Sequence, residues 1–364
     1  MTTPDLPLLG YDAIEFWVGN AKQAAHYYRS AFGFRLVAYA GPETGTRDRA
    51  AYVLQQRAIR FVIVSGLAPD DDISRHAARH GDGIRDVAFR VADAEGAYAL
   101  AIARGAVPHL EPTVTEDDYG KVVRASIRTY GDTVHTFVQR DDYSGVYLPG
   151  FEEVTDDPVA NPVGLSAIDH VVGNVGHGEM DEWSAYYERI LGFTQLRHFD
   201  DADISTEYSA LMSKVLWDGQ GRIKMPINEP AEGRKKSQIE EYLDAYRGPG
   251  VQHLALSTGD IVGTVRAMTQ AGVSFLPVPA DYYAEAKQRV GDVDESWDDL
   301  ARLGILVDRD EEGYLLQIFT EPVQDRPTVF YEIIQRHGSR GFGAGNFKAL
   351  FEAIEREQAR RGNL

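Results

Sequence analysis

The sequence predicts a mixed α+β protein built as two homologous halves, each made of strand–helix–strands units. Three observations support this prediction. The chain has 364 residues, and a single hydrophobic core usually stops growing below that length. The apolar periodicity stops at a proline- and acid-containing stretch, Phe151–Gly164. The segments on either side of this stretch can be laid over one another, which indicates an internal duplication.

The composition excludes several classes of protein. With 37 Lys+Arg, 56 Asp+Glu and a formal net charge of −19, the chain would repel phosphate backbones, so nucleic acid is not an expected partner. The absence of cysteine excludes disulfides, zinc–thiolate sites and cysteine nucleophiles. The start of the chain lacks a basic segment followed by an apolar one, and no apolar run approaches about 18 residues. We therefore expect a cytoplasmic protein without a membrane partner.

The first repeated segment is a strand that leads into a helix. Ile14–Asn20 can be overlaid on Ile168–Asn174 because both end in Val-Gly-Asn. Each strand runs into a helical stretch that carries a Tyr-Tyr pair and stops at a glycine followed by phenylalanine, as helix C-termini often do. These matching pairs are Tyr27-Tyr28 with Tyr186-Tyr187, and Gly33-Phe34 with Gly192-Phe193.

Two further repeated segments complete each half. Gly83–Phe89 and Gly250–Leu256 are each predicted to be a strand, followed by a helix that ends at Gly105 or Gly272. Farther along, Thr136–Arg140 aligns with Glu332–Arg336 through a shared Gln-Arg. The linker between the copies divides the chain into an N-terminal half, residues 1–152, and a C-terminal half, residues 153–364.

Three potential metal ligands stand on predicted strands of the C-terminal half: His170, His253 and Glu332. Because side chains alternate across a strand, each shares its face with apolar neighbours and is expected to point inward. A buried carboxylate is costly unless it is paired or bound to a cation. Two imidazoles and one carboxylate on three strands are the ligand set that suits non-haem Fe(II) with open coordination positions. The expected neighbours are Ile168 and Val172 for His170, Val251 and Ala255 for His253, and Phe330 and Ile334 for Glu332.

The N-terminal half provides an internal control for this site. Its matching positions are Phe16, Asp86 and Thr136, which cannot bind the same metal. An inward histidine taken singly is more often a hydrogen-bonded core residue than a ligand. The N-terminal copy, however, lacks all three ligands together. This joint absence favours a metal site that was duplicated with the rest of the chain and then lost from the N-terminal half.

Other motifs are weaker indications of function. His76 and His80 have the spacing of a metal-binding pair on a helix, but without a nearby general-base glutamate the pair is more typical of a solvated helix face. The glycine-rich stretch Gly341–Gly345 is predicted to be a hinge or turn before a final helix, Asn346 to about Arg361. The short basic run Arg234–Lys236 is expected to be solvated.

Several motifs between about residues 165 and 364 resemble one enzyme family when they are taken together. They are Asp169–Asn174, Lys224–Pro230, Lys236–Ile239, Gly250–His253, Tyr314–Thr320, Gln324–Thr328 and Gly341–Phe347. This set is similar to the motifs of the 4-hydroxyphenylpyruvate dioxygenases. Before residue 165 the similarity is only architectural.

That resemblance implies the vicinal-oxygen-chelate, or glyoxalase-like, fold, in which paired βαβββ modules form open barrels. It implies that residues 1–152 form a degenerate, metal-free domain with a structural role and oligomer contacts. Residues 153–364 would form the catalytic domain, with one Fe(II) per subunit on His170, His253 and Glu332 and with the C-terminal helix as a lid. It also implies a homodimer or homotetramer.

The resemblance further implies a substrate pocket. A 2-oxo acid needs two open metal positions, its phenol needs hydrogen-bonding partners, and its ring needs aromatic walls. Gln317, Asn228 and Gln252 are implied to act in catalysis. The implied substrate-binding residues are Ser213, Asn228, Gln238, Gln252, Gln317, Phe319, Phe330, Phe342, Asn346 and Phe347. Without the resemblance, each phenylalanine would be read as ordinary core packing.

The implied reaction converts 4-hydroxyphenylpyruvate and O₂ to homogentisate and CO₂, through oxidative decarboxylation, ring hydroxylation and side-chain migration in tyrosine catabolism. The first alternative is a 4-hydroxymandelate synthase, which has the same iron, substrate and fold. Against it, Pro226, Asn228 and Phe347 resemble the pattern of the dioxygenases. An extradiol catechol dioxygenase is a second alternative, which the Gln- and Phe-rich C-terminal motifs oppose. A non-enzymatic small-molecule-binding protein is a third, and it would need no metal triad.

Overall fold

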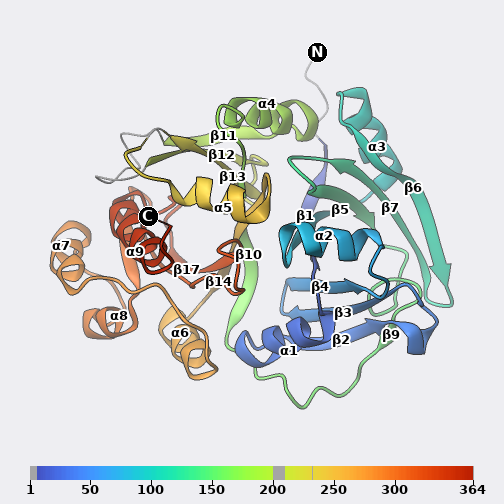
Figure 1. Cartoon of the computed structure of the whole chain (residues 1–364), viewed down its shortest axis with the longest axis horizontal. Coiled ribbons are helices and arrows are strands. Elements are labelled where there is room, and N and C mark those ends of the chain that lie inside the picture. Colours follow the sequence, from blue (N-terminus) through green and yellow to red (C-terminus); the bar gives the residue numbers. More distant parts are fainter. Residues whose placement is uncertain (1–5, 200–209, 232, 364) are drawn as a thin grey trace.

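The N-terminal half forms one curled sheet with helices on its surface (Figure 1). The computed structural model describes residues 6–199, 210–231 and 233–363. The N-terminal strands are β1 (Leu8–Trp17), β2 (Arg35–Ala40), β3 (Arg49–Gln56), β4 (Ile59–Gly66), β5 (Gly83–Val91), β6 (Pro108–Asp117), β7 (Gly120–Arg128), β8 (Val134–Gln139) and β9 (Glu152–Glu153). Its helices are α1 (Ala21–Ala31), α2 (Asp72–His80) and α3 (Ala94–Ala103), with the short 3-10 helix η1 (Pro42–Thr44). The strand order is β6-β7-β8-β5-β1-β4-β3-β2-β9.

The C-terminal half forms a second curled sheet beside the first (Figure 1). Its strands are β10 (Leu165–Asn174), β11 (Thr194–Phe199), β12 (Ala210–Trp217), β13 (Lys224–Ala231), β14 (Gly250–Thr258), β15 (Leu306–Arg309), β16 (Tyr314–Phe319) and β17 (Phe330–His337). Its helices are α4 (Met180–Leu191), α5 (Gln238–Tyr246), α6 (Ile261–Gln270), α7 (Ala280–Val290), α8 (Trp297–Leu303) and α9 (Phe347–Arg360), with η2 (Ala344–Asn346) before α9. The strand order is β11-β12-β13-β10-β14-β17-β16-β15.

The two sheets have the same topology, which confirms the prediction of two homologous α+β halves. In each half a strand–helix–three-strand module is followed by a second one, and the two modules meet where their first strands, β1 and β5 or β10 and β14, pair antiparallel. The turn predicted at Gly341–Gly345 also precedes a final helix as expected. Among the described residues, α7 and α8 have no N-terminal counterpart and lengthen the connection from α6 to β15.

β-Bulges correct the sequence alignment of the first strands. In the C-terminal half, Asp169 is the extra residue between Ile168 and His170 on β10. In the N-terminal half, Asp12 is the extra residue at the same point of β1. Because the residue after each bulge pairs with the matching alanine, Ala255 or Ala88, the position equivalent to His170 is Ala13 and not Phe16. The shared Val-Gly-Asn had placed the strands out of register.

The same bulges change two of the expected strand faces. Ile168 and Val251 belong to the main buried cluster together with Val171 and Leu254, and neither lines the pocket that His170 and His253 line. A bulge interrupts strict alternation, and the bulge residues Asp169 and Gln252 stand between these apolar residues and the ligands. The expectation that Ile168 and Val251 share the faces of His170 and His253 was therefore wrong.

The linker between the halves is anchored to the N-terminal half. Its first residues form β9, which pairs with β2, so the sheet of the first half extends to Glu153. Asp157 then accepts hydrogen bonds from Arg29 Nε, at 2.9 Å, and from the backbone N–H of Leu36, at 2.7 Å.

The histidine pair on α2 is buried, which corrects the expectation of a solvated helix face. His76 and His80 are 7% and 2% exposed, because α2 packs against α5 of the other half. His80 contacts the carbonyl oxygen of Tyr246 through Nδ1, and its Nε2 lies 2.8 Å from a carboxylate oxygen of Asp132. The pair therefore lies at the contact between the two halves.

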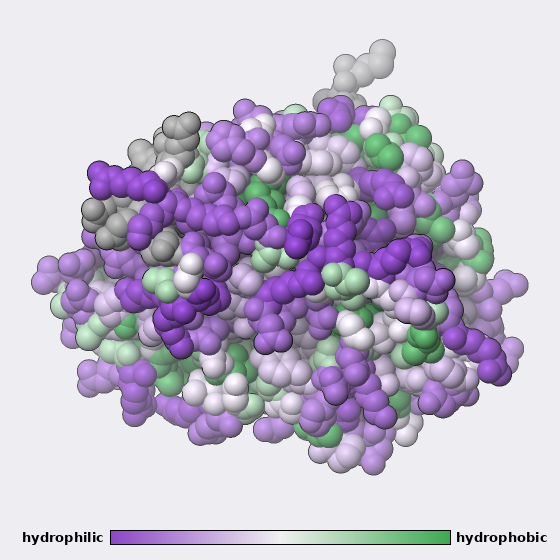
Figure 2. Space-filling view, viewed as in Figure 1, coloured by the Kyte–Doolittle hydropathy of each residue, from purple (hydrophilic) through white to green (hydrophobic). Residues whose placement is uncertain are grey.

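Hydrophilic side chains cover most of the face seen in Figure 2, in keeping with the high content of charged residues. In the part of the chain that the structure describes, none of the helices has the length and apolar character needed to cross a bilayer. The basic residues Arg234, Lys235 and Lys236 are exposed, as expected.

Candidate metal centre and pocket

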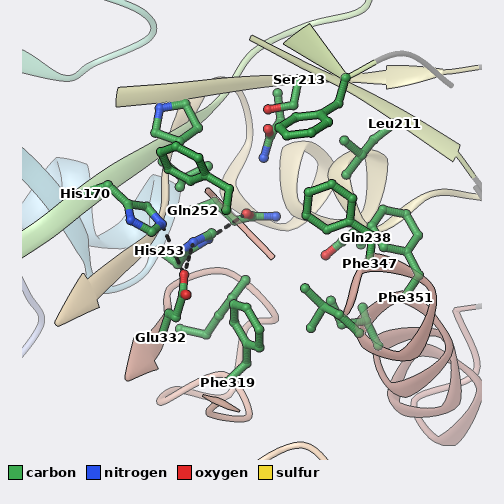
Figure 3. A pocket seen from close by; sticks show the side chains of 18 of the residues that line it. His170, Leu211, Ser213, Gln238, Gln252, His253, Phe319, Glu332, Phe347 and Phe351 are labelled. Atoms are coloured by element: carbon green, nitrogen blue, oxygen red, sulfur yellow. Dashed lines mark hydrogen bonds and ion pairs between the residues drawn. The ribbon is translucent and has the colours of Figure 1, made fainter. Parts of the chain in front are cut away.

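Three ligand side chains from β10, β14 and β17 meet inside the C-terminal sheet. His170, His253 and Glu332 are buried, and one ligand atom of each lies within 4.8 Å of the others. Glu332 Oε2 lies 3.1 Å from His170 Nε2 and 3.5 Å from His253 Nε2. Figure 3 shows both imidazoles pointing at this carboxylate. The arrangement fits a divalent cation, because two neutral imidazoles and one carboxylate converge and leave one side open.

Each ligand histidine is oriented by the side chain of the residue before it. His170 Nδ1 lies 2.8 Å from Asp169 Oδ1, and His253 Nδ1 lies 2.9 Å from Gln252 Oε1. A carboxylate only accepts hydrogen bonds, so the proton sits on Nδ1 of His170 and Nε2 stays free for a metal. Both contacts arise at bulges, where the preceding residue is the extra one in the strand.

The charges of the triad stabilise one another. Burial alone would raise the pKa of Glu332, but the charge and hydrogen bonds of His170 and His253 hold it below its usual value. Burial opposes protonation of both histidines; at His170 the carboxylates of Glu332 and Asp169 outweigh it and raise the pKa, whereas at His253 burial prevails and lowers it. The cluster thus combines a buried carboxylate with two imidazoles whose Nε2 atoms face it.

The corresponding positions of the N-terminal half lack this ligand set. They hold Ala13, Asp86 and Thr136, and the backbone N–H of Thr136 donates to Asp86 at 3.0 Å. Burial, and then the charge of Glu15, raises the pKa of Asp86 to about 7. These three positions therefore do not supply the same set of ligands.

A pocket opens beside the triad, lined mainly by apolar and aromatic side chains with a few amides among them. Of the ten predicted substrate residues, nine line it together with His170, His253 and Glu332; these nine are Ser213, Asn228, Gln238, Gln252, Gln317, Phe319, Phe330, Phe342 and Phe347. Ser213 and Asn228 are cross-strand neighbours on β12 and β13. Gln238 begins α5, where Ser237 and Glu240 form a capping box.

Asn346 is the exception among the predicted substrate residues. It is fully buried and is absent from the pocket lining. Its Oδ1 accepts a hydrogen bond from the Tyr282 hydroxyl at 2.6 Å. The contact ties the start of α9 to α7, a helix that the sequence analysis did not anticipate.

Gln317 carries a buried oxygen with no partner. The residue is 1% exposed, and its Oε1 makes no hydrogen bond among the described residues. A buried polar atom without a partner is costly. Its position in the pocket wall makes it available to a ligand.

Several apolar lining residues were missed by the sequence analysis. They are Phe199, Leu211, Val215, Leu350, Phe351 and Ile354; Val172 and Pro226, which the sequence had singled out, line the pocket too. For α9 a signal was present, since Phe347, Phe351 and Ile354 recur at helical spacing on one face. Figure 3 shows Phe347 and Phe351 across the pocket from the triad. The final helix thus forms one wall of the pocket.

Comparisons with known proteins agree with this architecture. Residues 3–152 match the family described as "Hydroxyphenylpyruvate dioxygenase, HPPD, N-terminal". Residues 167–318 match the family described as "Glyoxalase/Bleomycin resistance protein/Dioxygenase superfamily". The fold is therefore that of the glyoxalase, or vicinal-oxygen-chelate, superfamily.

Curated relatives match the chain from end to end. A 4-hydroxyphenylpyruvate dioxygenase from Yarrowia lipolytica is 50% identical, covering 98% of this chain and 93% of the relative. One from Dictyostelium discoideum is 49% identical, covering 98% of this chain and 100% of the relative. Among solved structures, a mutant 4-hydroxymandelate synthase from Streptomyces coelicolor is 34% identical, with a TM-score of 0.87 and coverage of 97% of this chain and 99% of that one.

Proposed function

The chain belongs to the 4-hydroxyphenylpyruvate dioxygenase family, and we propose that it converts 4-hydroxyphenylpyruvate and O₂ to homogentisate and CO₂ with one Fe(II) per subunit. The ligands would be His170, His253 and Glu332. The observation that carries the proposal is the convergence of these three side chains in a pocket lined by amide and phenylalanine side chains. Fe(II), when bound there, supplies the positions that chelate a 2-oxo acid and activate O₂.

The residues of the chain bind and orient the substrate. Ser213, Asn228 and Gln238 are neutral donors and acceptors suited to the phenol end of the substrate. Phe319, Phe330 and Phe342 offer apolar walls for its ring. Gln252, which also contacts His253, and Gln317, with its unpartnered oxygen, lie beside the triad and would orient the oxo-acid end. We place Asn346 in support of the α9 start rather than on the substrate.

The final helix would exclude water from the reaction. Phe347, Phe351 and Ile354 of α9 face the pocket, and the helix follows η2, whose N-cap is Gly343. Excluding water strengthens the electrostatic interactions inside a site and suppresses side reactions. We propose that residues 153–364 are the catalytic domain with α9 as its lid, and that residues 1–152 are a structural domain.

The alternative product is 4-hydroxymandelate, since a synthase of that product has the same overall structure. The dioxygenase is favoured because curated dioxygenases reach 50% identity whereas that synthase is 34% identical. The test is to incubate the protein with Fe(II), ascorbate, O₂ and 4-hydroxyphenylpyruvate and to identify the aromatic product by mass and retention. Homogentisate would support the proposal. If the product is 4-hydroxymandelate, the proposed product is wrong but the proposed metal site still stands. If protein that holds iron forms neither product, the substrate assignment is overturned.

We also propose that the protein is a cytoplasmic homodimer or homotetramer with contacts through the N-terminal half. Support comes from β6, a sheet edge whose side chains include the exposed apolar residues Leu110 and Val114. Unpaired edge strands favour pairing with another chain. Light scattering during gel filtration would give the mass, and a monomer would contradict the proposal.

A further inference from the structure

Asp169 lies behind the metal ligand His170 and is not among the residues that line the pocket. It is buried by the side chains around it, with 9% of its own side chain exposed. One carboxylate oxygen accepts the Nδ1 proton of His170. The same carboxylate receives a two-pronged contact from Arg336, whose Nε and Nη2 lie 2.8 and 2.9 Å from its two oxygens. Lys224 Nζ adds a third contact at 3.2 Å.

Arg336 extends this contact to the segment before α9. Its Nη1 donates to the carbonyl oxygen of Gly341 at 2.7 Å, and its guanidinium lies 5.7 Å from the centre of the Phe342 ring. Phe342 in turn packs edge-on against His170, with ring centres 5.1 Å apart. Asp169 is therefore hydrogen-bonded directly to the metal ligand His170, and through Arg336 it is linked to the Gly341–Phe342 wall of the pocket.

The N-terminal half contains the same clamp without a metal ligand. Asp12 occupies the equivalent bulge and receives Nε and Nη2 of Arg140 at 2.8 and 2.7 Å. Arg60 stands where Lys224 stands, 3.6 Å from Asp12. Arg140 donates to the carbonyl oxygen of Tyr147 and lies over its ring. An acid–arginine clamp thus holds the chain after the last strand in both halves, but only Asp169 is followed by a histidine.

We propose that Asp169 is a positioning residue that performs two tasks with one carboxylate. It fixes His170 with Nε2 free for the metal, and through Arg336 it fixes the Gly341–Phe342 part of the pocket wall. The inference rests on the proposed metal site. Partners behind metal-bound histidines fix the ring and raise its basicity, and their loss typically lowers metal affinity about 10- to 100-fold.

The first test measures the affinity of the metal-free protein for Co(II) by competition with a chelator. Asp169→Asn keeps an oxygen that can accept from His170, whereas Asp169→Ala removes it, so we expect the affinity to fall in the order wild type, Asn, Ala. The matched control is Asp12→Asn, which breaks the equivalent clamp where no ligand follows. We expect this control to lose stability and to bind Co(II) as the wild type does.

The second test follows trypsin cleavage after Arg340, an exposed residue in the clamped segment. We expect faster cleavage in Asp169→Asn and in Arg336→Gln and an unchanged rate in Asp12→Asn. Arg336→Gln leaves the contact between Asp169 and His170 in place, so its Co(II) affinity should fall less than that of Asp169→Ala.

The outcomes separate this inference from the proposed function. If the wild type binds no Co(II), the metal site itself is wrong. If the wild type binds but both Asp169 variants bind equally well, Asp169 is only a structural clamp and the inference is overturned. If affinity falls without faster cleavage at Arg340, the link to the pocket wall is overturned.

Discussion

The hydroxyl groups of Tyr28 and Tyr331 lie 2.8 Å apart and join the two halves of the molecule. Both side chains are buried, and Tyr331 directly precedes the metal ligand Glu332 on β17. Around them Phe32 and Phe61 pack against the Tyr331 ring. The strand that supplies the carboxylate of the triad is thus supported from behind by the N-terminal half.

Removing both of these hydroxyls should cost less than the sum of the two single removals. In Tyr331→Phe the buried Tyr28 hydroxyl loses its partner, which typically costs about 1–3 kcal/mol. In the double variant Tyr28→Phe/Tyr331→Phe no polar group is left unpaired, so the loss should be smaller than the sum of the single losses. Urea unfolding of the wild type, Tyr28→Phe, Tyr331→Phe and the double variant gives the coupling energy between the two hydroxyls. Strictly additive losses would show that the hydrogen bond does not join the halves energetically.

The triad should be required for iron binding, whereas its counterpart in the other half should not. His253→Ala removes one of three ligands, so we expect iron content after gel filtration to fall far below one per subunit and turnover to be lost. The control is Asp86→Asn at the equivalent position of the N-terminal half, which should retain both. A His253→Ala protein that keeps its iron and its turnover would contradict the assignment.

Asp86 should make the protein less stable as the pH rises. Its pKa is raised to about 7 in the folded state, by burial and then by Glu15, against about 3.9 in an unfolded chain. Between these values the folded state holds the extra proton, so the free energy of unfolding should fall from about pH 4 to pH 7, by at most about 1.4 kcal/mol per pH unit.

The comparison with Asp86→Asn isolates this contribution. The difference in unfolding free energy between variant and wild type should grow in favour of the variant from pH 4 to pH 7 and then level off. Chemical unfolding of both proteins at a series of pH values, in the same metal state, measures it. A difference that stays constant with pH would show that Asp86 ionises normally.

Gly343 should be needed for the position of Gln317. It has a φ of +73°, and a side-chain carbon there would collide with the Gln317 amide, whose Cδ would lie at 2.8 Å. We expect Gly343→Ala to displace this amide and lower kcat/KM by about tenfold, or about 1.4 kcal/mol, while metal binding is kept. Gly45→Ala is the control, because Gly45 has a φ of +92° and open space around it. Equal activity of the two variants would mean that Gln317 can move without effect.

The metal triad could be predicted from the sequence because its signals are local and repeated. His170, His253 and Glu332 each lie in an apolar strand, and the strand topology of one half repeats in the other. The comparison of the halves remained valid although one position was wrong, since Ala13 is as unable to bind a metal as Phe16. The family resemblance added the pocket, and nine of its ten residues lie together in the structure.

What escaped prediction depends on partners far away in the sequence. The bulge at Asp169 is visible only from the pairing of β10 with β14. His80 is buried by Tyr246 and Asp132, which are distant in the chain. Asn346 turns toward Tyr282 of α7, a helix that has no copy among the described residues of the first half. Periodicity reports which residues are apolar, but it does not report which element covers them.

The repeated bulges have a consequence for how the enzyme is assembled. The N-terminal half builds the same strand order, the same bulge before the ligand position and the same acid–arginine clamp, and it does so with no metal-binding residues at Ala13 and Thr136. Its curled sheet forms without the ligand set of the other half at these positions. By the same physics the C-terminal barrel can close before any ion arrives, unlike small zinc domains that fold only around their metal. We therefore expect the C-terminal half to fold without its metal and to take up the metal afterwards.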